Sequence, residues 1–353
     1  MSYTAVPMGL EHRAAVLHLW KDNMSDPRIA SVLEERYRWL YEENPEGPAR
    51  TVVAVHQAKG DVVGCGSAYP RRMYLNRVEL TAGVPSDFAV ARTHRIGGAA
   101  VAIQRALVEG EPSDYAMYLA FPNRHSLPIF RRLGYKPMAE ARAWIKPLRA
   151  GYKVRTKIRN GALAAVAAAP IDLWLAAADR VRGLRHRRAV TETVSRADAR
   201  FDRLWNRARD GYVLAGERSS AYLNWRYADF KTDAYRFFCV CDPESKELSG
   251  YVVFRINDKK VFIADLFAAD MGAAAEQVLN RFSRAMRGLG CDSVFLAYAG
   301  NPAFTGILGR HGFFRGSGAP RQLLVFARGL TAEQERAVMD PANWFMFDGE
   351  MDI

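Results

Sequence analysis

The sequence predicts a mixed α/β fold made of two related domains, and three observations point to it. The chain has 353 residues, more than the roughly 100–200 residues of a typical domain. Strand-like and helix-like patterns alternate along it, and its two halves share residues at nearly constant offsets. With 49% hydrophobic and 25% charged residues, the composition supports a sizeable core and excludes a disordered or fibrous protein.

The repeat is carried by residues that sit in matching patterns. At an offset of 186 residues, segment 37–41 (YRWLY) matches segment 223–227 (LNWRY), so that Trp39 falls on Trp225. After a loop of different length the offset becomes 178. It then pairs Asp87 with Asp265, Asn123 with Asn301, Arg132 with Arg310 and Gly134 with Gly312. Several matches at a constant offset indicate a duplicated domain.

In the first half the pattern predicts, in order, a strand, two helices, three strands, a helix, a strand, a helix and a strand. Asp26 and Pro27 form a typical helix start, and Gly134 lies where a helix gives way to a strand. These strands outnumber those of a parallel βαβ sheet, so we expect a mixed, mostly antiparallel sheet flanked by helices. The ranges are 3–6, 11–23, 27–43, 51–56, 62–69, 78–91, 98–108, 115–120, 123–133 and 135–145.

The positive charge is concentrated in one segment. Net charge is +12, and the eleven Lys and Arg residues from Lys146 to Arg188, against only Asp172 and Asp179, account for +9 of it. Such a segment is attracted to acidic partners or anionic surfaces. The excess therefore belongs to a linker and not to a basic domain, and nucleic acid is not an expected partner.

The middle of this segment, residues 161–178, is rich in Ala, Leu and Val. Pro170 and Asp172 are expected to interrupt it, so a membrane-spanning helix is not expected. Helical spacing from Ile171 onward is followed by Trp174, Leu175, Ala178 and Val181. We expect an inter-domain linker that packs its apolar side on the domains. The alternatives are an amphipathic helix at an anionic membrane surface and a contact with an acidic protein such as an acyl-carrier protein.

The cysteines and histidines predict neither disulfides nor a metal site. Four cysteines are too few for a disulfide scaffold, none has zinc-type spacing, and the histidines show no metal-ligand spacing. The N-terminal residues lack the pattern of a signal peptide. We expect a cytoplasmic protein without a metal, with peripheral attachment to the inner face of the membrane as an alternative.

A Gly-rich turn after the strand at 78–91 is the sharpest local signal. Gly97 and Gly98 open a helix whose first N–H groups lack intrahelical acceptors. With the helix dipole and the Arg95 side chain, this turn suits a pyrophosphate. It is neither a P-loop nor a GxGxxG motif, and a plain tight turn is the alternative.

Here the sequence resembles a known family. Arg95-x-x-Gly98-x-Ala100 is similar to the Arg/Gln-x-x-Gly-x-Gly/Ala motif of the GCN5-related N-acetyltransferases (GNAT). Segment 121–135, FPNRHSLPIFRRLGY, resembles the second conserved stretch of that superfamily. The resemblance covers residues 3–149, and it implies two tandem GNAT-like domains that use acetyl-CoA or another acyl-CoA.

The resemblance also implies roles for individual residues. The backbone of Phe88, Ala89 and Val90 would pair with the pantetheine arm. Asn123 and Ser126 would contact the pantetheine or the adenosine. The pyrophosphate would be held by backbone N–H groups of Arg95, Ile96, Gly97, Gly98, Ala99 and Ala100.

In the implied reaction a substrate amine attacks the thioester, a general base removes the amine proton, and a donor protonates the thiolate. Candidate bases are Asp87, Glu79 and His94. Because Asp87 has the partner Asp265 in the repeat, a shared structural role is its alternative. Many family members place a Tyr donor where this chain has Phe130. Tyr135 and Tyr118 are the possible substitutes.

The second half departs from the motif. At the offset of 178, Gly98 falls on Glu276, whose charge repels a pyrophosphate, so we expect this half not to bind CoA. The predicted boundaries are 1–149 for the acyl-CoA-binding domain, 150–189 for the linker and 190–353 for a degenerate GNAT-like domain. The acidic, aromatic end, residues 343–353, is either a final strand or a tail that crosses to the other domain.

The function expected from these observations is transfer of an acyl group from acyl-CoA to an amine. The acceptor would be a small molecule or an amine linked to a lipid or sugar, and the second domain would shape its site. Two alternatives remain. One is an acyltransferase that uses acyl-carrier protein as donor, and the other is a non-catalytic acyl-CoA-binding or scaffold protein.

Overall fold

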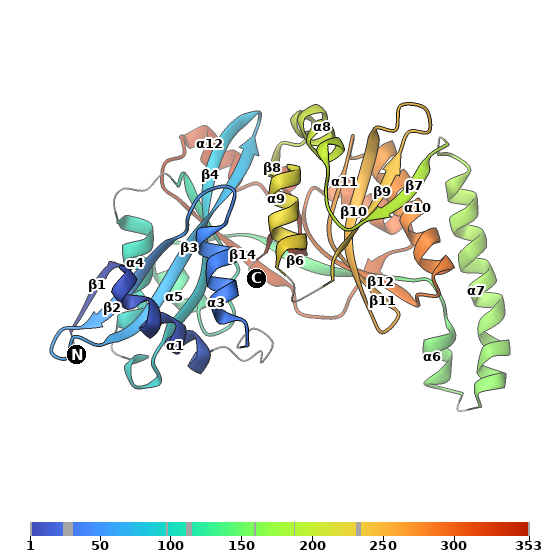
Figure 1. Ribbon diagram of the computed structural model, residues 1–353. Coiled ribbons are helices and arrows are strands. Elements are labelled where there is room, and N and C mark those ends of the chain that lie inside the picture. Colours follow the sequence, from blue (N-terminus) through green and yellow to red (C-terminus); the bar gives the residue numbers. More distant parts are fainter. Residues whose placement is uncertain are drawn as a thin grey trace.

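The computed structural model describes residues 2–23, 31–96, 98–110, 115–158, 160–186, 188–230 and 234–351 (Figure 1). It consists of two lobes side by side, each a mixed sheet with helices packed against it. The fold class predicted from the sequence is therefore confirmed. A pair of helices, α6 and α7, lies on the side of the second lobe away from the first (Figure 1).

The first lobe follows the predicted order of elements, although the helix expected at 123–133 begins only at Leu127. The predicted helix start at Asp26 and Pro27 lies outside the described residues. The elements are β1 (Tyr3–Pro7), η1 (Leu10–His12), α1 (Arg13–Asn23), α3 (Leu33–Tyr37), η2 (Arg38–Glu42), β2 (Arg50–His56), β3 (Val62–Leu75), β4 (Val78–Val90), η3 (Arg92–His94), α4 (Ala99–Glu109), β5 (Met117–Ala120), α5 (Leu127–Arg132) and β6 (Lys136–Pro147).

The linker and the second lobe complete the chain. Their elements are α6 (Gly151–Arg155), α7 (Gly161–Gly183), β7 (Val190–Val194), α8 (Ala199–Ala208), η4 (Arg209–Gly211), β8 (Leu214–Gly216), α9 (Ser220–Asn224), η5 (Trp225–Asp229), β9 (Arg236–Cys241), β10 (Leu248–Asn257), β11 (Lys260–Ala268), α10 (Ala273–Gly288), β12 (Ser293–Gly300), α11 (Pro302–Arg310), β13 (Phe314–Arg315), β14 (Arg321–Ala327), α12 (Ala332–Val338), η6 (Pro341–Asn343), β15 (Phe345–Phe347) and η7 (Asp348–Glu350).

The strands form one hydrogen-bonded path in the order β1-β2-β3-β4-β5-β14-β6-β12-β11-β10-β9-β7. Most neighbours are antiparallel, whereas β4 pairs with β5 and β11 pairs with β12 in parallel. The two parallel pairs occupy corresponding places in the two lobes. The duplication read from the sequence thus appears in the sheet topology.

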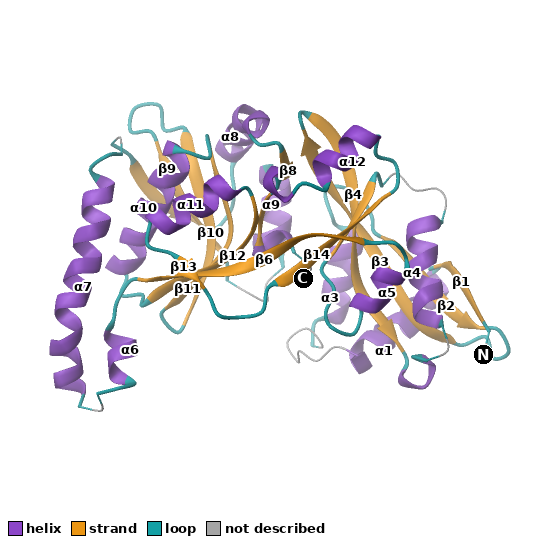
Figure 2. Cartoon of the chain, turned by 180° about the vertical axis from the view of Figure 1, so that it is seen from behind, coloured by secondary structure: helices purple, strands orange, loops and turns teal. Residues whose placement is uncertain are grey.

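The lobes exchange strands across the predicted domain boundaries. Residues 136–141 of β6 pair with β14, and residues 142–147 pair with β12 of the second lobe. β14, late in the chain, lies between β5 and β6 and completes the first lobe (Figure 2). The boundaries 1–149 and 190–353 stay a prediction about the duplicated segments, and each lobe takes hydrogen-bond partners from the other.

A pair of tryptophans marks the pseudo-two-fold relation between the lobes. The indole Nε1 of Trp39 donates to the Trp225 carbonyl at 2.6 Å, and that of Trp225 donates to the Trp39 carbonyl at 2.7 Å. Their rings stack at 5.2 Å between centroids. Gly134 and Gly312 share positive φ angles of 91° and 82° after corresponding helices. The 186 and 178 offsets thus relate equivalent positions.

The linker helix α7 differs from the expectation. It runs without interruption through Pro170 and Asp172 from Gly161 to Gly183, with the Asn160 side chain capping its start. Pro removes one backbone hydrogen bond from a helix, and here the turns before it are held by inward-facing Ala164 and Ala168. By length and composition alone, α7 is long and apolar enough to cross a membrane.

We expect Trp39→Phe and Trp225→Phe each to destabilise the protein by about 1–3 kcal/mol, because each leaves a buried carbonyl without its donor. The measurement is urea unfolding followed by circular dichroism. Trp174→Phe is the matched control, since Trp174 is largely exposed, and its effect should stay within about 0.5 kcal/mol. Equal stability of all three variants would show that the reciprocal hydrogen bonds between Trp39 and Trp225 do not stabilise the protein.

Candidate functional site

A split between β4 and β5 forms the centre of the first lobe. The two strands pair only at Ala82 with Met117 and at Gly83 with Tyr118. β4 then continues to Val90, paired on its other edge with β3, while β5 ends at Ala120. Beyond Gly83, no described strand pairs with the β5-facing edge of β4. Phe88, Ala89 and Val90, the predicted pantetheine contacts, lie along this open edge.

The predicted pyrophosphate turn lies at the open end of the split. Gly98 caps α4 with a left-handed φ of 90°, and a Cβ there would meet nothing within 4 Å. Glycine is therefore required at this position for its backbone conformation and not for lack of space. Ala99 and Ala100 form the first turn of α4, where N–H groups lack intrahelical acceptors. Gly97 lies outside the described residues.

Arg95 joins this turn to the first helix. Its Nη2 donates to Oδ1 of Asn23 at 2.7 Å, and its Nε donates to the Val90 carbonyl at 3.3 Å. The neighbouring Ile96 side chain is fully exposed. A pocket of about 370 Å³ opens beside the turn, between the end of α1 and the start of η3. It is lined by Leu19, Asp22, Asn23, Ala91, Arg92 and Thr93.

Asn123 and Ser126 form the turn that leads into α5. The Asn123 side-chain oxygen accepts from the backbone N–H groups of His125 and Ser126, at 2.9 and 3.1 Å. Its repeat partner Asn301 caps α11 in the same manner. Because the second lobe keeps this cap, the duplicated asparagine has a structural role. A contact of Asn123 or Ser126 with a cofactor stays a prediction.

Asp87 lies at a bulge in β4 and is fully engaged. Its φ is 49°, a conformation that costs free energy in a non-glycine residue. Arg36 on α3 donates to both carboxylate oxygens, at 2.8 and 3.3 Å, and the Tyr41 hydroxyl donates to Oδ2 at 2.5 Å. The Asp87 carbonyl accepts from Trp20 Nε1 at 3.0 Å. Burial, and next the nearby Asp87 carboxylate, raise the pKa of Tyr41.

The second lobe repeats this arrangement at Asp265. Arg218 donates to both of its carboxylate oxygens, and the Tyr251 hydroxyl approaches Oδ2 at 3.3 Å. Arg36 and Arg218 are not related by the offset of 186, so an arginine reaches the bulge from a different position in each lobe. The geometry thus favours the structural alternative for Asp87. Its catalytic role stays a prediction.

The structure does not bring Glu79 to the split. Glu79 lies at the other end of β4, half exposed, where it contacts Arg72 at 3.3 Å and the Tyr74 hydroxyl at 3.1 Å. Glu79 and Asp87 are eight positions apart on this strand, which is about 26 Å along the chain. His94 is nearer the predicted turn, and its Nδ1 meets the Tyr3 hydroxyl at 3.1 Å.

Tyr135 lies buried in an aromatic cluster under α5. Its ring packs edge-on against Phe130 and tilted against Phe326, at 4.9 and 5.3 Å between centroids. Among the described residues, none hydrogen-bonds its hydroxyl. Burial raises its pKa well above the ordinary value. Tyr118, the other substitute for the missing donor, already donates to the Leu107 carbonyl.

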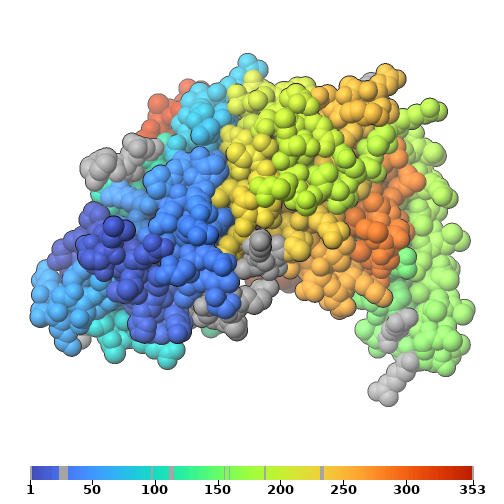
Figure 3. All heavy atoms as spheres, in the orientation of Figure 1, coloured from blue at the N-terminus to red at the C-terminus, as the bar shows by residue number. Residues whose placement is uncertain are grey.

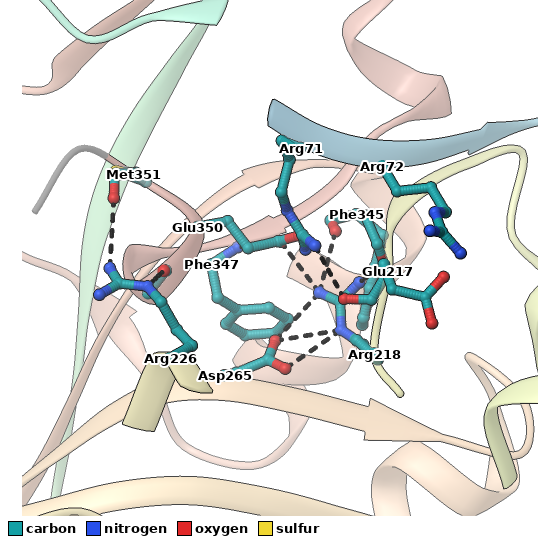
Figure 4. Close-up of polar contacts among 12 residues, drawn as sticks. Arg71, Arg72, Glu217, Arg218, Arg226, Asp265, Phe345, Phe347, Glu350 and Met351 are labelled. Atoms are coloured by element: carbon teal, nitrogen blue, oxygen red, sulfur yellow. Dashed lines mark hydrogen bonds and ion pairs between the residues drawn. The ribbon is translucent and has the colours of Figure 1, made fainter. Parts of the chain in front are cut away.

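The C-terminal segment lies between the lobes and carries a buried ionic cluster (Figure 4). Oε1 of Glu350 accepts from Arg71 on β3 of the first lobe at 2.9 Å. Its Oε2 accepts from Arg218 of the second lobe, also at 2.9 Å. The end of the chain is thus both a short strand, β15, and a segment that reaches the other lobe. Its Glu350 carboxylate is neutralised by two arginines.

Two further carboxylates at this interface keep an oxygen without a hydrogen-bond partner among the described residues. These are Oε1 of Glu46, in the loop after η2, and Oε2 of Glu217. Glu46 accepts from the Arg72 backbone N–H and lies 3.5 Å from Arg71. Burial, only partly offset by Arg71, raises the pKa of Glu46 to about 7. Sequence patterns gave no signal for Glu46, Arg36 or Arg71.

The equivalent split in the second lobe is filled. β15 pairs with β12 at residues 298–300, on the side that β11 occupies at residues 293–296. η7 follows it against β11, where a Cβ on Gly349 would lie 2.8 Å from the Ala264 carbonyl. Helix α10 starts at Ala273, about one turn before the position that corresponds to the start of α4. Glu276, at the position of Gly98, pairs with Arg310 at 2.6 Å.

Comparison with known proteins agrees with this geometry. Residues 7–138 match the family model described as the acetyltransferase (GNAT) domain. A search of curated proteins finds no match.

Three solved structures share the fold over most of the chain. GCN5-related N-acetyltransferases from Anabaena variabilis and Kribbella flavida align at TM-scores of 0.62 and 0.60, with 15% and 14% identity. Each alignment covers 92% of this chain and 72% of the chain it is compared with. The Saccharomyces cerevisiae N-myristoyltransferase with bound myristoyl-CoA aligns at 0.55, with 11% identity, over 97% of this chain and 89% of its own. At these identities the similarity concerns the fold.

We expect Asp87→Ala to destabilise the protein by about 3–5 kcal/mol, because Arg36 would remain buried without a counter-charge. Glu79→Ala on the same strand is the control. It removes an exposed pair and should cost less than about 1 kcal/mol. Denaturant unfolding measures both values. An Asp87→Ala protein with unchanged stability but no activity would instead give Asp87 the catalytic role.

Proposed function

We propose that the chain is an acyltransferase of the GCN5-related N-acetyltransferase superfamily, whose domain model matches residues 7–138, and that it transfers an acyl group from acyl-CoA to an amine. The observation that carries this proposal is the open β4–β5 split, which ends at the glycine-capped N-terminus of α4. An extended thiol arm can pair with the open strand edge, and a pyrophosphate suits the helix end.

The residues of the first lobe fit a CoA thioester. The edge of β4 at Phe88, Ala89 and Val90 offers main-chain groups to the pantetheine. The turn at Arg95, Ile96 and Gly98, with the first amides of α4, offers donors to the pyrophosphate. Acetyl-CoA is the simplest donor, and the length of the acyl chain is left open. The protein's own contribution is to hold this donor rigidly beside the acceptor.

The second lobe then serves the acceptor and not the donor. Its split holds β15, and a carboxylate stands at the position of Gly98. The Glu350 bridge fixes this lobe against β3 of the first lobe. The acceptor site would lie on the α1 and α3 side of the first sheet, where the C-terminal segment and the lobe interface border it.

We assign the general base to Glu46. A base that removes a proton from an ammonium works best when its pKa is near the working pH, and that of Glu46 is about 7. Its Oε1 makes no hydrogen bond to a described residue. It lies beside Arg72, two residues along β3 from Pro70, which pairs with Gly83 where the split begins.

Tyr135 is the proposed donor to the departing thiolate. Its raised pKa keeps the hydroxyl protonated, and no described residue competes for that proton. Phe130 stands where other members carry a tyrosine, and Tyr135 packs directly against its ring. Tyr118 is less suited because its hydroxyl is already bonded to the backbone.

Acetyl-CoA should raise the melting temperature, by about 5–10 °C at a concentration near 100 times its Kd. Gly98→Glu should abolish the rise, because it places a carboxylate at the pyrophosphate. Gly60→Glu is the matched control: Gly60 also has positive φ and open space around its Cβ, but lies in the β2–β3 turn. No shift with any acyl-CoA would overturn the donor assignment. A shift without release of free CoA in the presence of primary amines would favour the non-catalytic alternative.

The rate should rise with pH through an apparent pKa of about 7, because Glu46 must be ionised to accept a proton. Glu46→Gln should lower kcat by about 10²–10⁴-fold and remove this acidic limb. Glu43→Gln, an exposed neighbour, is the control and should keep both the rate and the limb. A Glu46→Gln enzyme that retains the acidic limb would exclude Glu46 as the base.

The Glu46→Gln variant should also change how stability depends on pH. Since burial raises the pKa of Glu46 from 4.5 to about 7, the folded state loses stability as pH rises through that interval. The amide does not titrate, so the substitution removes this contribution. Urea unfolding at a series of pH values between 4 and 8 measures it, and an identical pH dependence in the wild type and the variant would contradict the raised pKa.

A further inference from the structure

Helix α7 exposes a continuous apolar side that no described part of the chain covers. Leu173 and Trp174 are 72% and 66% exposed, and Leu184 at the C-cap is 79% exposed. Exposed apolar patches of this extent mark interaction surfaces in soluble proteins. At 1.5 Å per residue the surface is about 30 Å long. Its members recur at helical spacing: Leu163, Val166, Leu173, Trp174, Val181 and Leu184.

The opposite side of α7 is attached firmly to the second lobe. Asp179 is buried and accepts from Lys146 on β6, and its Oδ2 lies 2.8 Å from Arg287 on α10. Asn280 donates to the Asp179 carbonyl at 2.8 Å. Asp172 accepts from the backbone N–H of Ala150, before α6, at 2.6 Å. Both carboxylates of the helix thus interact with other parts of the protein.

The exposed side therefore carries no charge from residue 161 to residue 179. Asp172 and Asp179 are the only charged residues in that stretch. Positive side chains lie beyond both of its ends. Lys153 and Lys157 are exposed next to the start of α7, and Arg180 and Arg185 are exposed near its end. In Figures 1 and 3 this helix forms the outer edge of the second lobe, away from the first lobe.

We propose that α7 is a membrane-docking helix, which lies flat with its apolar side in the interface of an anionic lipid bilayer. An apolar side with basic residues at its ends is the pattern of such helices. Each basic residue near an anionic leaflet contributes about 1 kcal/mol of attraction. A tryptophan such as Trp174 suits the headgroup level, because its ring is amphipathic.

Two other occupants fit the surface less well. A second copy of the chain would bring basic residues against basic residues in either relative direction, because both ends of α7 are positive. A spanning helix would have to leave the lobe and break the ion pair of Asp179 with Lys146. Burial lowers the pKa of Lys146 to about 8, yet the pair with Asp179 at 2.8 Å holds it in place.

The test is co-sedimentation of the full chain with vesicles of phosphatidylcholine alone or mixed with phosphatidylglycerol. The wild type should sediment with the mixed vesicles only, and high salt should release it. Leu173→Asp combined with Trp174→Asp should reduce the bound fraction by roughly tenfold or more, and so should Lys153→Glu combined with Arg185→Glu. Leu289→Asp is the matched control, since Leu289 is equally exposed elsewhere on this lobe, and it should bind as the wild type does.

Unchanged melting temperatures are expected for all variants because their side chains are exposed, so lost binding would not reflect unfolding. Three outcomes would overturn the proposal. The first is no binding of the wild type, or equal binding of Leu173→Asp/Trp174→Asp. The second is a wild type that is dimeric by light scattering while the Leu173→Asp/Trp174→Asp variant is monomeric. The third is bound protein that resists both high salt and an alkaline wash, which would indicate insertion. The result does not depend on catalysis, and the acetyl-CoA melting shift reports the proposed function separately.

Discussion

The strand exchange at β6 is the constraint on which the rest of the structure depends. This single strand hydrogen-bonds with β14 through residues 136–141 and with β12 through residues 142–147, so the sheets of the two lobes become one path. Neither lobe can complete its sheet from its own contiguous segment. The open split of the first lobe, the lobe interface and the C-terminal segment therefore hold fixed positions relative to one another. The site proposed at this junction would benefit from such rigidity.

A buried aspartate–arginine pair lies beside the split in each lobe. Asp87 and Asp265 occupy the bulge region of β4 and β11, and each is paired with an arginine from a helix or loop packed on the sheet. A buried carboxylate without such a partner would carry a large desolvation cost. The bulges redirect each strand as it leaves its parallel neighbour. This shared device explains why the aspartate survives in both halves, although only one split is open.

The two lobes differ in whether the split between their parallel strands is open or filled. In the first lobe the strands separate and the glycine-capped turn of α4 stands at the opening. In the second lobe β15 enters with its own Phe345 and Phe347 side chains buried, and α10 begins a turn earlier. The lobe whose split is filled also contains the inter-lobe anchor Glu350. One copy thus supports the geometry of the other.

The sequence by itself determined the duplication, the fold class and the location of the glycine-capped turn before α4. The Arg95–Ala100 motif is a local pattern, and the match of Trp39 with Trp225 is a repeat at a constant offset. Both kinds of pattern can be recognised in the sequence without a structure. Tertiary structure alone decided the strand exchange, the pairing of Asp87 with Arg36, the distance of Glu79 from the split, the unbroken course of α7 and the environment of Glu46. Those features depend on contacts between residues far apart in the chain, and burial, which sets both ion pairing and pKa, is a property of the packed molecule.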